Sequence, residues 1–358
     1  MDKLTNFYKN KKILVTGATG FKGSWLCFWL IKLGAKVYGT GFRKYKSKKL
    51  FFDFNLKKII NLKFLDIRNF KQVNKFIKDT KPEIIFHLAA QPLVSSSYKY
   101  PMHTFDVNLM GTLNILEASK NCKNVRSVIC VTTDRVYEHD GGNKKFKETD
   151  KLGGVDPYSL SKASAELIVK SYKEIFKKIK KQCGISSVRT ANIVGGGDWA
   201  HNRLIPDAIK SFTANKTLTV RNPNFTRQWQ FVLEPLNGYL ILAKKQYGKL
   251  NEFSSNWNFG PNTEVSVIEI VKLIIKFWKE GKYKIVKNKK FTEQKNILLN
   301  MNKANRYLKW KTIYNTKKSI QVTIKWYIDV IKNKKNSADV TNDQINSYMK
   351  LANLRKRK

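Results

Sequence analysis

The sequence predicts an α/β protein built on a Rossmann-type, doubly wound parallel sheet with a smaller C-terminal substrate-binding lobe. Short β-branched runs alternate with helix-length segments, a glycine-rich turn follows the first run, and the alternation stops near residue 190. Strands that alternate with helices form parallel sheets covered on both faces. We therefore expect a dinucleotide-binding domain over residues 1–190. Residues 191–358 are expected to form mainly the substrate-binding lobe, with some segments packing back on the first domain.

The first strand is expected over 12–16, where KILVT enters Gly17, and the first helix over 21–33, an apolar segment that Gly34 ends. Similar β-branched runs, separated by segments long enough for crossover helices, predict further strands over 35–39, 62–66, 84–88, 127–132 and 186–189. Beyond residue 190, glycine-rich loops and short strands replace this pattern.

Composition excludes several classes of protein. With 358 residues, 42% of them hydrophobic, the chain can bury a sizeable core. It has no apolar run of the ~18 residues that a membrane helix needs and no secretory segment, so we expect a cytoplasmic protein. The four cysteines lack metal or disulfide spacing and are expected to be free and buried, and the four scattered histidines predict no metal site.

The net charge of +43 allows two interpretations, a polyanion-binding surface or a general compositional bias. Lysines occur in almost every segment and form no single basic stripe, which favours the second interpretation. We expect no specific nucleic-acid partner, although non-specific adhesion to nucleic acid would follow from the charge.

The glycine-rich turn is either a dinucleotide site or a structural turn. Gly17, Gly20 and Gly23 are spaced three residues apart, between a predicted strand and a predicted helix, which is the context of a pyrophosphate-binding turn. Thr19 and Phe21 complete the turn. The dinucleotide site is the favoured interpretation, because glycine lets the backbone approach the phosphates closely.

The residues at the ends of the next predicted strands indicate which dinucleotide is bound and what contacts it. Residues 37–43 contain no Asp or Glu to hold the adenosine ribose, which by the simple rule favours NADP with Arg43 near its 2′-phosphate. Asp66 and Ile67 are placed to meet the adenine. The strand expected over 84–88 ends in Leu88, Ala89 and Ala90, which supply small residues that a cofactor can lie against. Ordinary sheet packing would also explain these residues.

Tyr158 and Lys162 form a Y-x-x-x-K pattern one helical turn apart. An ammonium beside the phenol would lower a pKa that is ordinarily about 10, so that Tyr158 could accept a proton from a sugar hydroxyl during hydride transfer. Taken alone, the pattern also fits a solvated helix face.

The glycine turn, the segment 87–90, the pair Thr133-Asp134 and the Tyr158/Lys162 pair together resemble the extended short-chain dehydrogenase/reductase family, whose members act on nucleotide sugars. Longer runs over most of the chain are most similar to its CDP-glucose 4,6-dehydratase subgroup: GFKGSWL at 20–26, QPLV at 91–94, GGGDWA at 195–200, RLIPD at 203–207, RNP at 221–223, TRQWQ at 226–230 and VLEPL at 232–236.

The resemblance implies a lyase that holds NAD, despite the missing ribose acid, and converts CDP-glucose to CDP-4-keto-6-deoxyglucose. In such enzymes C4 is oxidised, water leaves across C5 and C6, and the same hydride returns to C6. By resemblance, Tyr158 deprotonates the C4 hydroxyl, Lys162 holds the nicotinamide ribose, Thr133 bonds the C4 oxygen and Asp134 protonates the departing C6 hydroxyl. Arg135 stands where related enzymes have Glu or Lys; a guanidinium stays protonated, so we expect electrostatic stabilisation there and leave the C5 base unassigned.

The substrate side is expected to hold a nucleoside diphosphate, which favours bidentate arginine contacts. The candidates are Gln91, Asn192, Arg203, Leu204, Arg221, Arg227 and Trp229. The family resemblance also implies a homodimer or homotetramer. The alternatives are dehydration of another sugar nucleotide, a 4-epimerase, against which Asp134 argues, and a non-enzymatic nucleotide- or nucleic-acid-binding module, against which the intact Tyr158/Lys162 pair argues.

Overall fold

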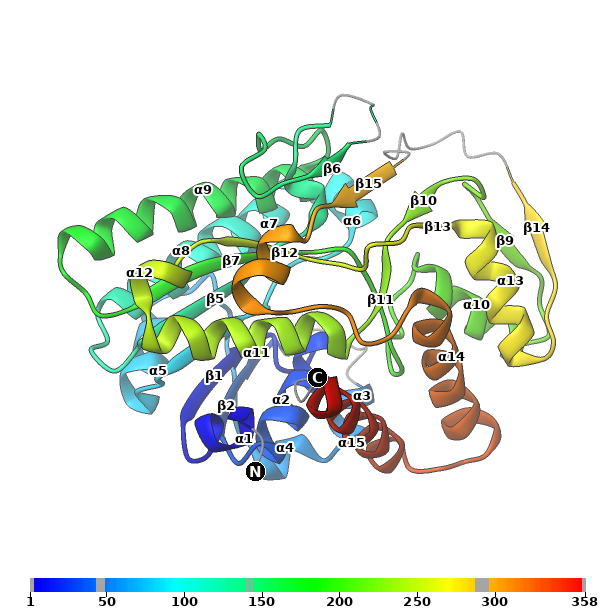
Figure 1. Ribbon diagram of the computed structural model, residues 1–358, viewed down its shortest axis with the longest axis horizontal. Helices are drawn as coiled ribbons and strands as arrows, with labels where there is room; N and C mark the ends of the chain where they lie inside the picture. Colours follow the sequence, from blue (N-terminus) through cyan, green and yellow to red (C-terminus); the bar gives the residue numbers. More distant parts are fainter. Residues whose placement is uncertain (1–2, 43–48, 140–141, 143, 287–295, 356–358) are drawn as a thin grey trace.

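The computed structural model describes residues 3–42, 49–139, 142, 144–286 and 296–355. Its centre is a seven-stranded sheet of order β12-β7-β5-β4-β1-β2-β3, in which all neighbours are parallel (Figure 1). The strands are β1 (Lys12–Thr16), β2 (Lys36–Gly41), β3 (Asn61–Phe64), β4 (Ile84–His87), β5 (Ser127–Val131), β7 (Gly184–Thr190) and β12 (Asn256–Phe259).

The predicted Rossmann-type fold is confirmed, and all six strands expected before residue 190 lie in this sheet. The seventh strand, β12, was not predicted. Its sequence NWNF carries no β-branched residue, and it becomes a strand because it pairs along β7 with three of its four residues buried. Tertiary packing here overrides a weak local preference.

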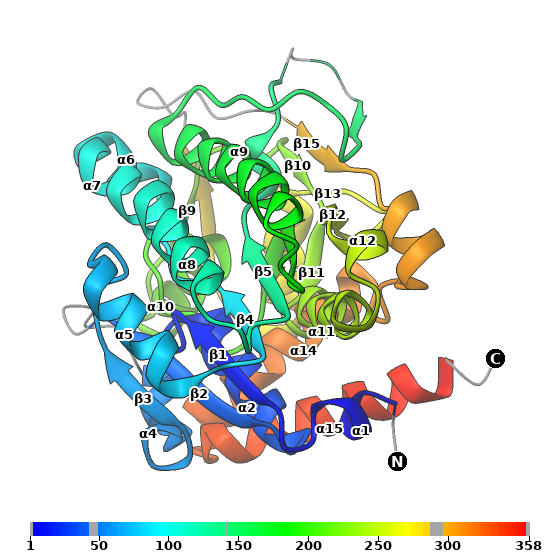
Figure 2. The same ribbon diagram turned by 90° about the vertical axis from the view of Figure 1, so that its left-hand side faces the viewer.

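Helices cover both faces of the sheet (Figures 1 and 2). One face packs against α5, α8 and α9 through a core that includes Ile77, Leu116 and Val169. The other packs against α2 and α11 through a core that includes Trp25 and Leu240. The bounds are α2 (Phe21–Lys32), α5 (Phe70–Thr80), α8 (Gly111–Lys120), α9 (Pro157–Lys178) and α11 (Leu233–Gly248), with α1 (Lys3–Tyr8), α3 (Lys49–Asp53), α4 (Leu56–Ile59), α6 (Val94–Lys99), α7 (Pro101–Phe105), the π-helix η1 (Asp106–Met110), the 3₁₀-helix η2 (Asp134–Val136) and α12 (Leu250–Phe253) at the margins.

The remaining elements form a smaller, mixed layer beyond the carboxyl ends of the main strands (Figure 1). It holds a four-stranded sheet of order β13-β10-β15-β6 and two two-stranded sheets, β11–β8 and β14–β9. Its strands are β6 (Lys145–Phe146), β8 (Asn192–Val194), β9 (Leu218–Val220), β10 (Thr226–Arg227), β11 (Trp229–Phe231), β13 (Val265–Ser266), β14 (Tyr283–Ile285) and β15 (Asn296–Leu299). Its helices are α10 (Leu204–Thr213), α13 (Val267–Trp278), α14 (Thr316–Tyr327) and η4 (Ile328–Lys332). Two later helices return to the main domain: η3 (Ala304–Leu308) packs against α11 and β12, and α15 (Ser337–Arg355) packs against α3 and α14 (Figure 1).

The chain crosses between the two layers more than once. Strand β6 precedes residue 190 yet pairs with β15, whereas α11 and β12 follow residue 190 yet belong to the main sheet and its cover. The division into a cofactor domain and a substrate lobe at residue 190 therefore stays a functional prediction.

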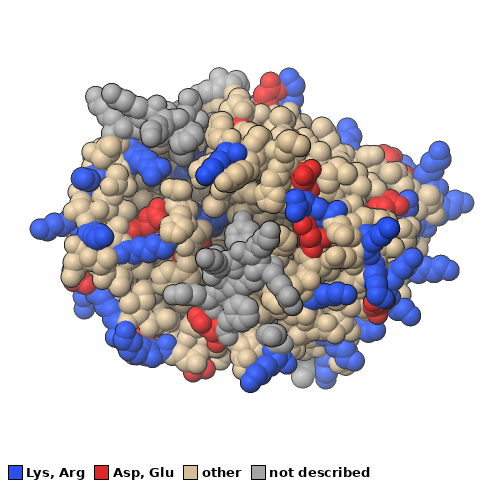
Figure 3. Space-filling view, turned by 180° about the vertical axis from the view of Figure 1, so that it is seen from behind, with Lys and Arg blue, Asp and Glu red and all other residues tan. Residues whose placement is uncertain are grey.

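The structure bears on three expectations from the composition: the state of the cysteines, the absence of a membrane helix and the distribution of charge. All four cysteines are free and buried, as predicted. Among the described residues, no helix is long and apolar enough to cross a membrane. On the face shown in Figure 3, Lys and Arg side chains are scattered, with Asp and Glu among them.

Candidate active site

The turn after β1 is built so that its backbone can approach a ligand. Gly17 has φ of +70°, and a Cβ there would lie 2.8 Å from the backbone nitrogen of Ala89. A Cβ on Gly23 would lie 2.1 Å from the carbonyl oxygen of Gly17. Helix α2 begins at Phe21 with Gly20 as N-cap and no side-chain capping bond. The first N–H groups of α2 are thus available for an anion, which fits a dinucleotide diphosphate.

The segment after β4 is held beside this turn by buried polar contacts. Thr16 Oγ1 lies 2.7 Å from His87 Nδ1 and accepts a hydrogen bond from the Ala89 N–H at 3.2 Å. His87 Nε2 contacts Thr112 Oγ1 at 3.1 Å. Burial and the charge of Lys162 lower the pKa of His87 to about 3, so this histidine is neutral and structural.

A cavity of about 1290 Å³ opens at the carboxyl ends of the main strands, under the smaller layer. Strand β1 lies there between β2 and β4, the switch point where ligands bind in doubly wound sheets. The cavity is lined by every predicted site residue except Lys162: Gly17, Thr19, Gly20, Phe21, Gly23, Asp66, Ile67, Leu88, Ala89, Ala90, Gln91, Thr133, Asp134, Arg135, Tyr158, Asn192, Arg203, Leu204, Arg221, Arg227 and Trp229.

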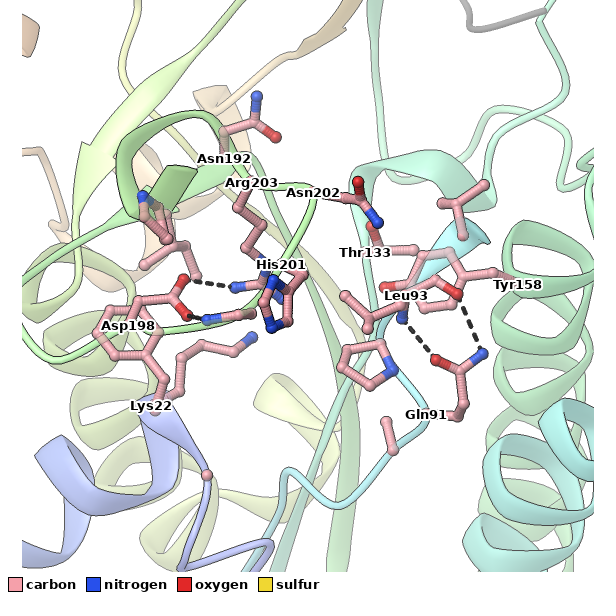
Figure 4. Close-up of a pocket in the computed structure, with 18 of the residues that line it drawn as sticks. Lys22, Gln91, Leu93, Thr133, Tyr158, Asn192, Asp198, His201, Asn202 and Arg203 are labelled. Atoms are coloured by element: carbon pink, nitrogen blue, oxygen red, sulfur yellow. Dashed lines mark hydrogen bonds and ion pairs between the residues drawn. The ribbon is translucent and has the colours of Figure 1, made fainter. Parts of the chain in front are cut away.

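Tyr158 and Lys162 both lie on α9 but have different surroundings. Tyr158 points into the cavity (Figure 4), whereas Lys162 is 5% exposed and its Nζ donates to the Val131 carbonyl at 3.1 Å. Burial lowers the pKa of Lys162 to about 8. Burial also raises the pKa of Tyr158, which a hydrogen bond with Thr133 and the charges of Arg135 and Arg203 only partly offset. Lys162 is not among the main causes of this shift, and the net shift of the Tyr158 pKa is upward, opposite to the direction expected from the pair.

Thr133 and Asp134 follow β5 and face Tyr158. Thr133 Oγ1 donates to Asp134 Oδ1 at 3.0 Å and also bonds the Tyr158 side chain. The Asp134 side chain is almost fully buried, and this burial raises its pKa against the opposing charges of Arg135 and Arg227. A raised pKa makes the protonated carboxyl more populated at a given pH, and the protonated form can donate a proton.

The predicted arginines occupy one wall of the cavity in different ways. Arg203 Nη1 pairs with Asp198 Oδ2 at 2.9 Å (Figure 4). Arg227 is nearly buried and donates to the Thr226 carbonyl at 2.8 Å, whereas Arg221 is exposed. The cluster is thus partly anchored and partly open to a ligand.

Two other predicted substrate contacts are already engaged within the protein. The Gln91 side chain bonds both the N–H and the carbonyl of Leu93 (Figure 4) and also Thr104, so its amide shapes the loop. Trp229 is 8% exposed and its Nε1 donates to Val265, which makes it a wall. Asn192, at the start of β8, lines the cavity.

The adenosine end of the cavity follows β2 and β3. Thr40, Gly41 and Phe42 line it, and residue 43, the proposed contact of a 2′-phosphate, lies outside the described residues. The Asp66 carboxylate is held by three side-chain contacts from Arg68, the shortest at 2.6 Å. Burial opposes ionisation of Asp66, but these bonds bring its pKa below the ordinary value.

Among the cavity-lining residues that the sequence interpretation missed are Lys22, Arg68, Asp198 and His201. Lys22 lies inside the glycine turn and Asp198 inside the matched GGGDWA run, so their positions in these motifs could have identified both. Arg68 and His201 carry no such signal, because their place in the cavity follows from the packing of distant loops.

A parallel sheet with a glycine turn at its switch point, and a Tyr-Lys pair one turn apart beside it, define an extended short-chain dehydrogenase/reductase. Residues 14–323 match the family model described as GDP-mannose 4,6-dehydratase, and the chain belongs to this family. The family predicted from the sequence is confirmed.

Curated relatives and solved structures agree with this assignment. The chain is 38% identical over 329 residues to a CDP-glucose 4,6-dehydratase of Salmonella typhimurium, covering 90% of this chain and 92% of the relative. It is 28% identical to the human dTDP-D-glucose 4,6-dehydratase, over 91% and 92% of the two chains. The fold matches the dTDP-glucose 4,6-dehydratase of Bacillus anthracis in complex with NAD, with a TM-score of 0.76 at 23% identity, over 90% of this chain and 98% of that one.

Proposed function

We propose that this protein is a CDP-glucose 4,6-dehydratase, a hydro-lyase that yields CDP-4-keto-6-deoxyglucose. The observation that carries the proposal is the buried carboxyl of Asp134, joined through Thr133 to Tyr158 in one cavity. A 4-epimerisation needs a proton acceptor at C4 but no acid for a leaving hydroxyl. The 38% identical relative named for this reaction supports the CDP-glucose assignment.

The chain's residues divide the chemistry as follows. Tyr158 takes the proton of the C4 hydroxyl, and Thr133 bonds the C4 oxygen. The resulting 4-keto group acidifies the C5 proton, which is why oxidation precedes elimination. Asp134 donates a proton to the C6 hydroxyl, which leaves as water while C5 gives its proton to a base that we leave unassigned. The hydride taken from C4 then returns to C6 and C5 regains a proton, so that no net redox change occurs.

Arg135 follows Asp134 in the short helix η2 and is partly exposed at the cavity. A guanidinium cannot act as a general base at neutral pH. Its fixed positive charge would stabilise the enolate that forms when C5 loses its proton, and the same charge makes Asp134 easier to ionise.

NAD is the proposed cofactor, and it supplies reversible hydride acceptance when bound. The residues that fit it are the glycine turn with Thr19 and Phe21, the Leu88–Ala90 segment with no bulky side chain after Leu88, and Asp66 with Ile67 at the adenine end. Lys162, behind Tyr158, is proposed to hold the nicotinamide ribose. The diphosphate of the sugar nucleotide is assigned to Arg203, Arg221 and Arg227 with Asn192, and Gln91, Leu204 and Trp229 complete the substrate wall.

Incubation of the protein with CDP-glucose and NAD tests the function, with NMR of the sugar as the readout. We expect CDP-4-keto-6-deoxyglucose without net formation of reduced cofactor. Parallel incubations with UDP-glucose and dTDP-glucose determine the base specificity. Unchanged CDP-glucose, or its C4 epimer, would contradict the proposal.

We also propose a cytoplasmic homodimer that supplies a deoxysugar pathway, consistent with the four free thiols. The supporting surface is an exposed apolar group on adjoining helices at the α9 side (Figure 2): Met102 on α7, Met110 on η1, and Leu160 and Leu167 on α9. Monomers rarely expose apolar side chains in such groups.

Leu167→Glu is expected to weaken self-association at least tenfold, because an unpaired carboxylate would be buried at the contact. Light scattering after size-exclusion chromatography measures the mass of the assembly at several concentrations. Ile59→Glu is the matched control, since Ile59 is equally exposed (54% against 56%) on α4. An unchanged dimer in Leu167→Glu would contradict this interface.

A further inference from the structure

Lys22 is a charged residue of the cavity to which the mechanism above gives no role. It is the second residue of α2 and lies between Gly20 and Gly23 of the glycine turn. In Figure 4 its side chain rises from α2 toward Arg203 and His201, on the opposite side of the cavity from Tyr158. Within the described part of the chain, its ammonium forms no ion pair with an acidic group.

The surroundings of Lys22 are unfavourable to a positive charge. Burial in the cavity is the main cause that lowers its pKa to about 7, and the charges of Lys162 on α9 and Arg203 before α10 lower it further. Asp134, after β5, acts in the opposite direction. His201 also faces this region. The ammonium is therefore only about half protonated near neutral pH, and a nearby anion would restore its charge.

The anion that fits this place is a diphosphate. The turn that carries Lys22 presents uncapped N–H groups at the start of α2, and no acidic residue occupies the first turn of that helix. The described end of β2 offers Thr40, Gly41 and Phe42, none of which can hold a ribose as a carboxylate would. The positive charge that the turn itself offers to a diphosphate is the ammonium of Lys22.

We propose that Lys22 is a cofactor-positioning residue whose ammonium pairs with the diphosphate of the dinucleotide, so that cofactor binding takes up a proton. The proposal rests on the proposed NAD-dependent function. The substrate carries the same diphosphate chemistry. We assign Lys22 to the cofactor because its backbone belongs to the pyrophosphate turn, whereas the arginines proposed for the substrate lie in the smaller layer.

Calorimetric titration of the whole protein with NAD alone is the test. For the wild type, we expect the affinity to fall about fourfold from about pH 6 to about pH 7.5, since the protonated fraction falls that much for a pKa of about 7. Buffers of different ionisation enthalpy should report uptake of more than half a proton at the higher pH.

Two substitutions isolate this effect from Lys162, His201 and other titrating groups. Lys22→Met is expected to bind NAD about tenfold more weakly near pH 6 and to lose the proton uptake. Lys22→Arg is expected to keep binding without proton uptake, because a guanidinium is always charged. Lys32→Met, at the exposed end of the same helix, is the control and should match the wild type in both measurements.

The outcomes distinguish failure of the proposed NAD-dependent function from failure of the role proposed for Lys22. If the wild type binds no NAD, the proposed function fails. If the wild type binds NAD but Lys22→Met shows the same affinity and the same proton uptake, the role of Lys22 is refuted and the function stands. Titration with CDP alone completes the design: a loss of CDP binding with intact NAD binding would place Lys22 at the substrate and overturn the assignment. Circular dichroism confirms that each variant is folded.

Discussion

Asp134→Asn is expected to slow formation of the 4-keto-6-deoxy product by about 10²–10⁴-fold, the usual contribution of a positioned general acid. Asparagine has nearly the same shape and can accept the Thr133 hydrogen bond that Asp134 Oδ1 accepts at 3.0 Å. It cannot donate an acidic proton to a departing hydroxyl. Oxidation at C4 depends on Tyr158 and Thr133 and should proceed, so the reaction is expected to stop after its first half.

Single-turnover absorbance of the reduced nicotinamide separates the two halves of the reaction. We expect the reduced cofactor to accumulate in Asp134→Asn and to stay undetected in the wild type. Tyr158→Phe should show neither accumulation nor product, because C4 oxidation itself fails. Asp79→Asn replaces an exposed carboxylate on α5 and should behave as the wild type.

The assigned role of Asp134 is wrong if its variant loses C4 oxidation instead. The pH dependence of the elimination step in the wild type is a second measurement, because the proposed role of Asp134 requires its protonated form. Burial raises its pKa, so the elimination step should slow as pH rises through that value. Asp134→Asn has no such proton, and the corresponding part of its pH profile should be flat.

Much of this site was predictable because local sequence and fold agree there. The β-branched run before Gly17 and the glycine spacing are local signals, and the parallel sheet then brings the ends of separate strands together. Tyr158 and Asp134 could be matched as motif residues without knowledge of their distance. Strand β12 and residue Arg68 gave no local signal, because their positions depend on pairing with segments far away in the chain.

Electrostatic interactions were harder to predict than positions. One helical turn between Tyr158 and Lys162 suggests a direct charge effect, but Lys162 extends toward the Val131 carbonyl instead. Burial, which no spacing rule reports, determines the direction of the pKa shift at Tyr158, Asp134 and Lys22.

The second large effect concerns a buried ion pair behind the site. Glu166 on α9 and Arg189 on β7 are each 1% exposed in their side chains and form two contacts, at 2.8 and 2.6 Å. Glu166 also accepts hydrogen bonds from Thr132 at 2.6 Å and Ser187 at 2.8 Å. The pair therefore fixes α9, which carries Tyr158, against β5 and β7.

Glu166→Gln is expected to lower the free energy of unfolding by about 3–5 kcal/mol, because the guanidinium of Arg189 would stay buried without its counter-charge. Chemical denaturation at neutral pH measures this change. Glu252→Gln breaks an exposed pair with Lys249 and should change the same quantity by less than about 1 kcal/mol. A change in Glu166→Gln as small as in Glu252→Gln would contradict the account.

Two further measurements test whether the buried Glu166–Arg189 ion pair causes this loss of stability: the pH dependence of unfolding and a double variant. Burial opposes ionisation of Glu166, yet Arg189 keeps its pKa below the ordinary 4.5. The folded-state pKa is thus the lower one, so the stabilisation is complete above about pH 4.5 and is lost as pH falls toward the folded-state value. The stability difference between wild type and Glu166→Gln should shrink over that acid range. Adding Arg189→Met to Glu166→Gln removes the unpaired charge and should recover part of the lost stability, whereas two independent losses would simply add.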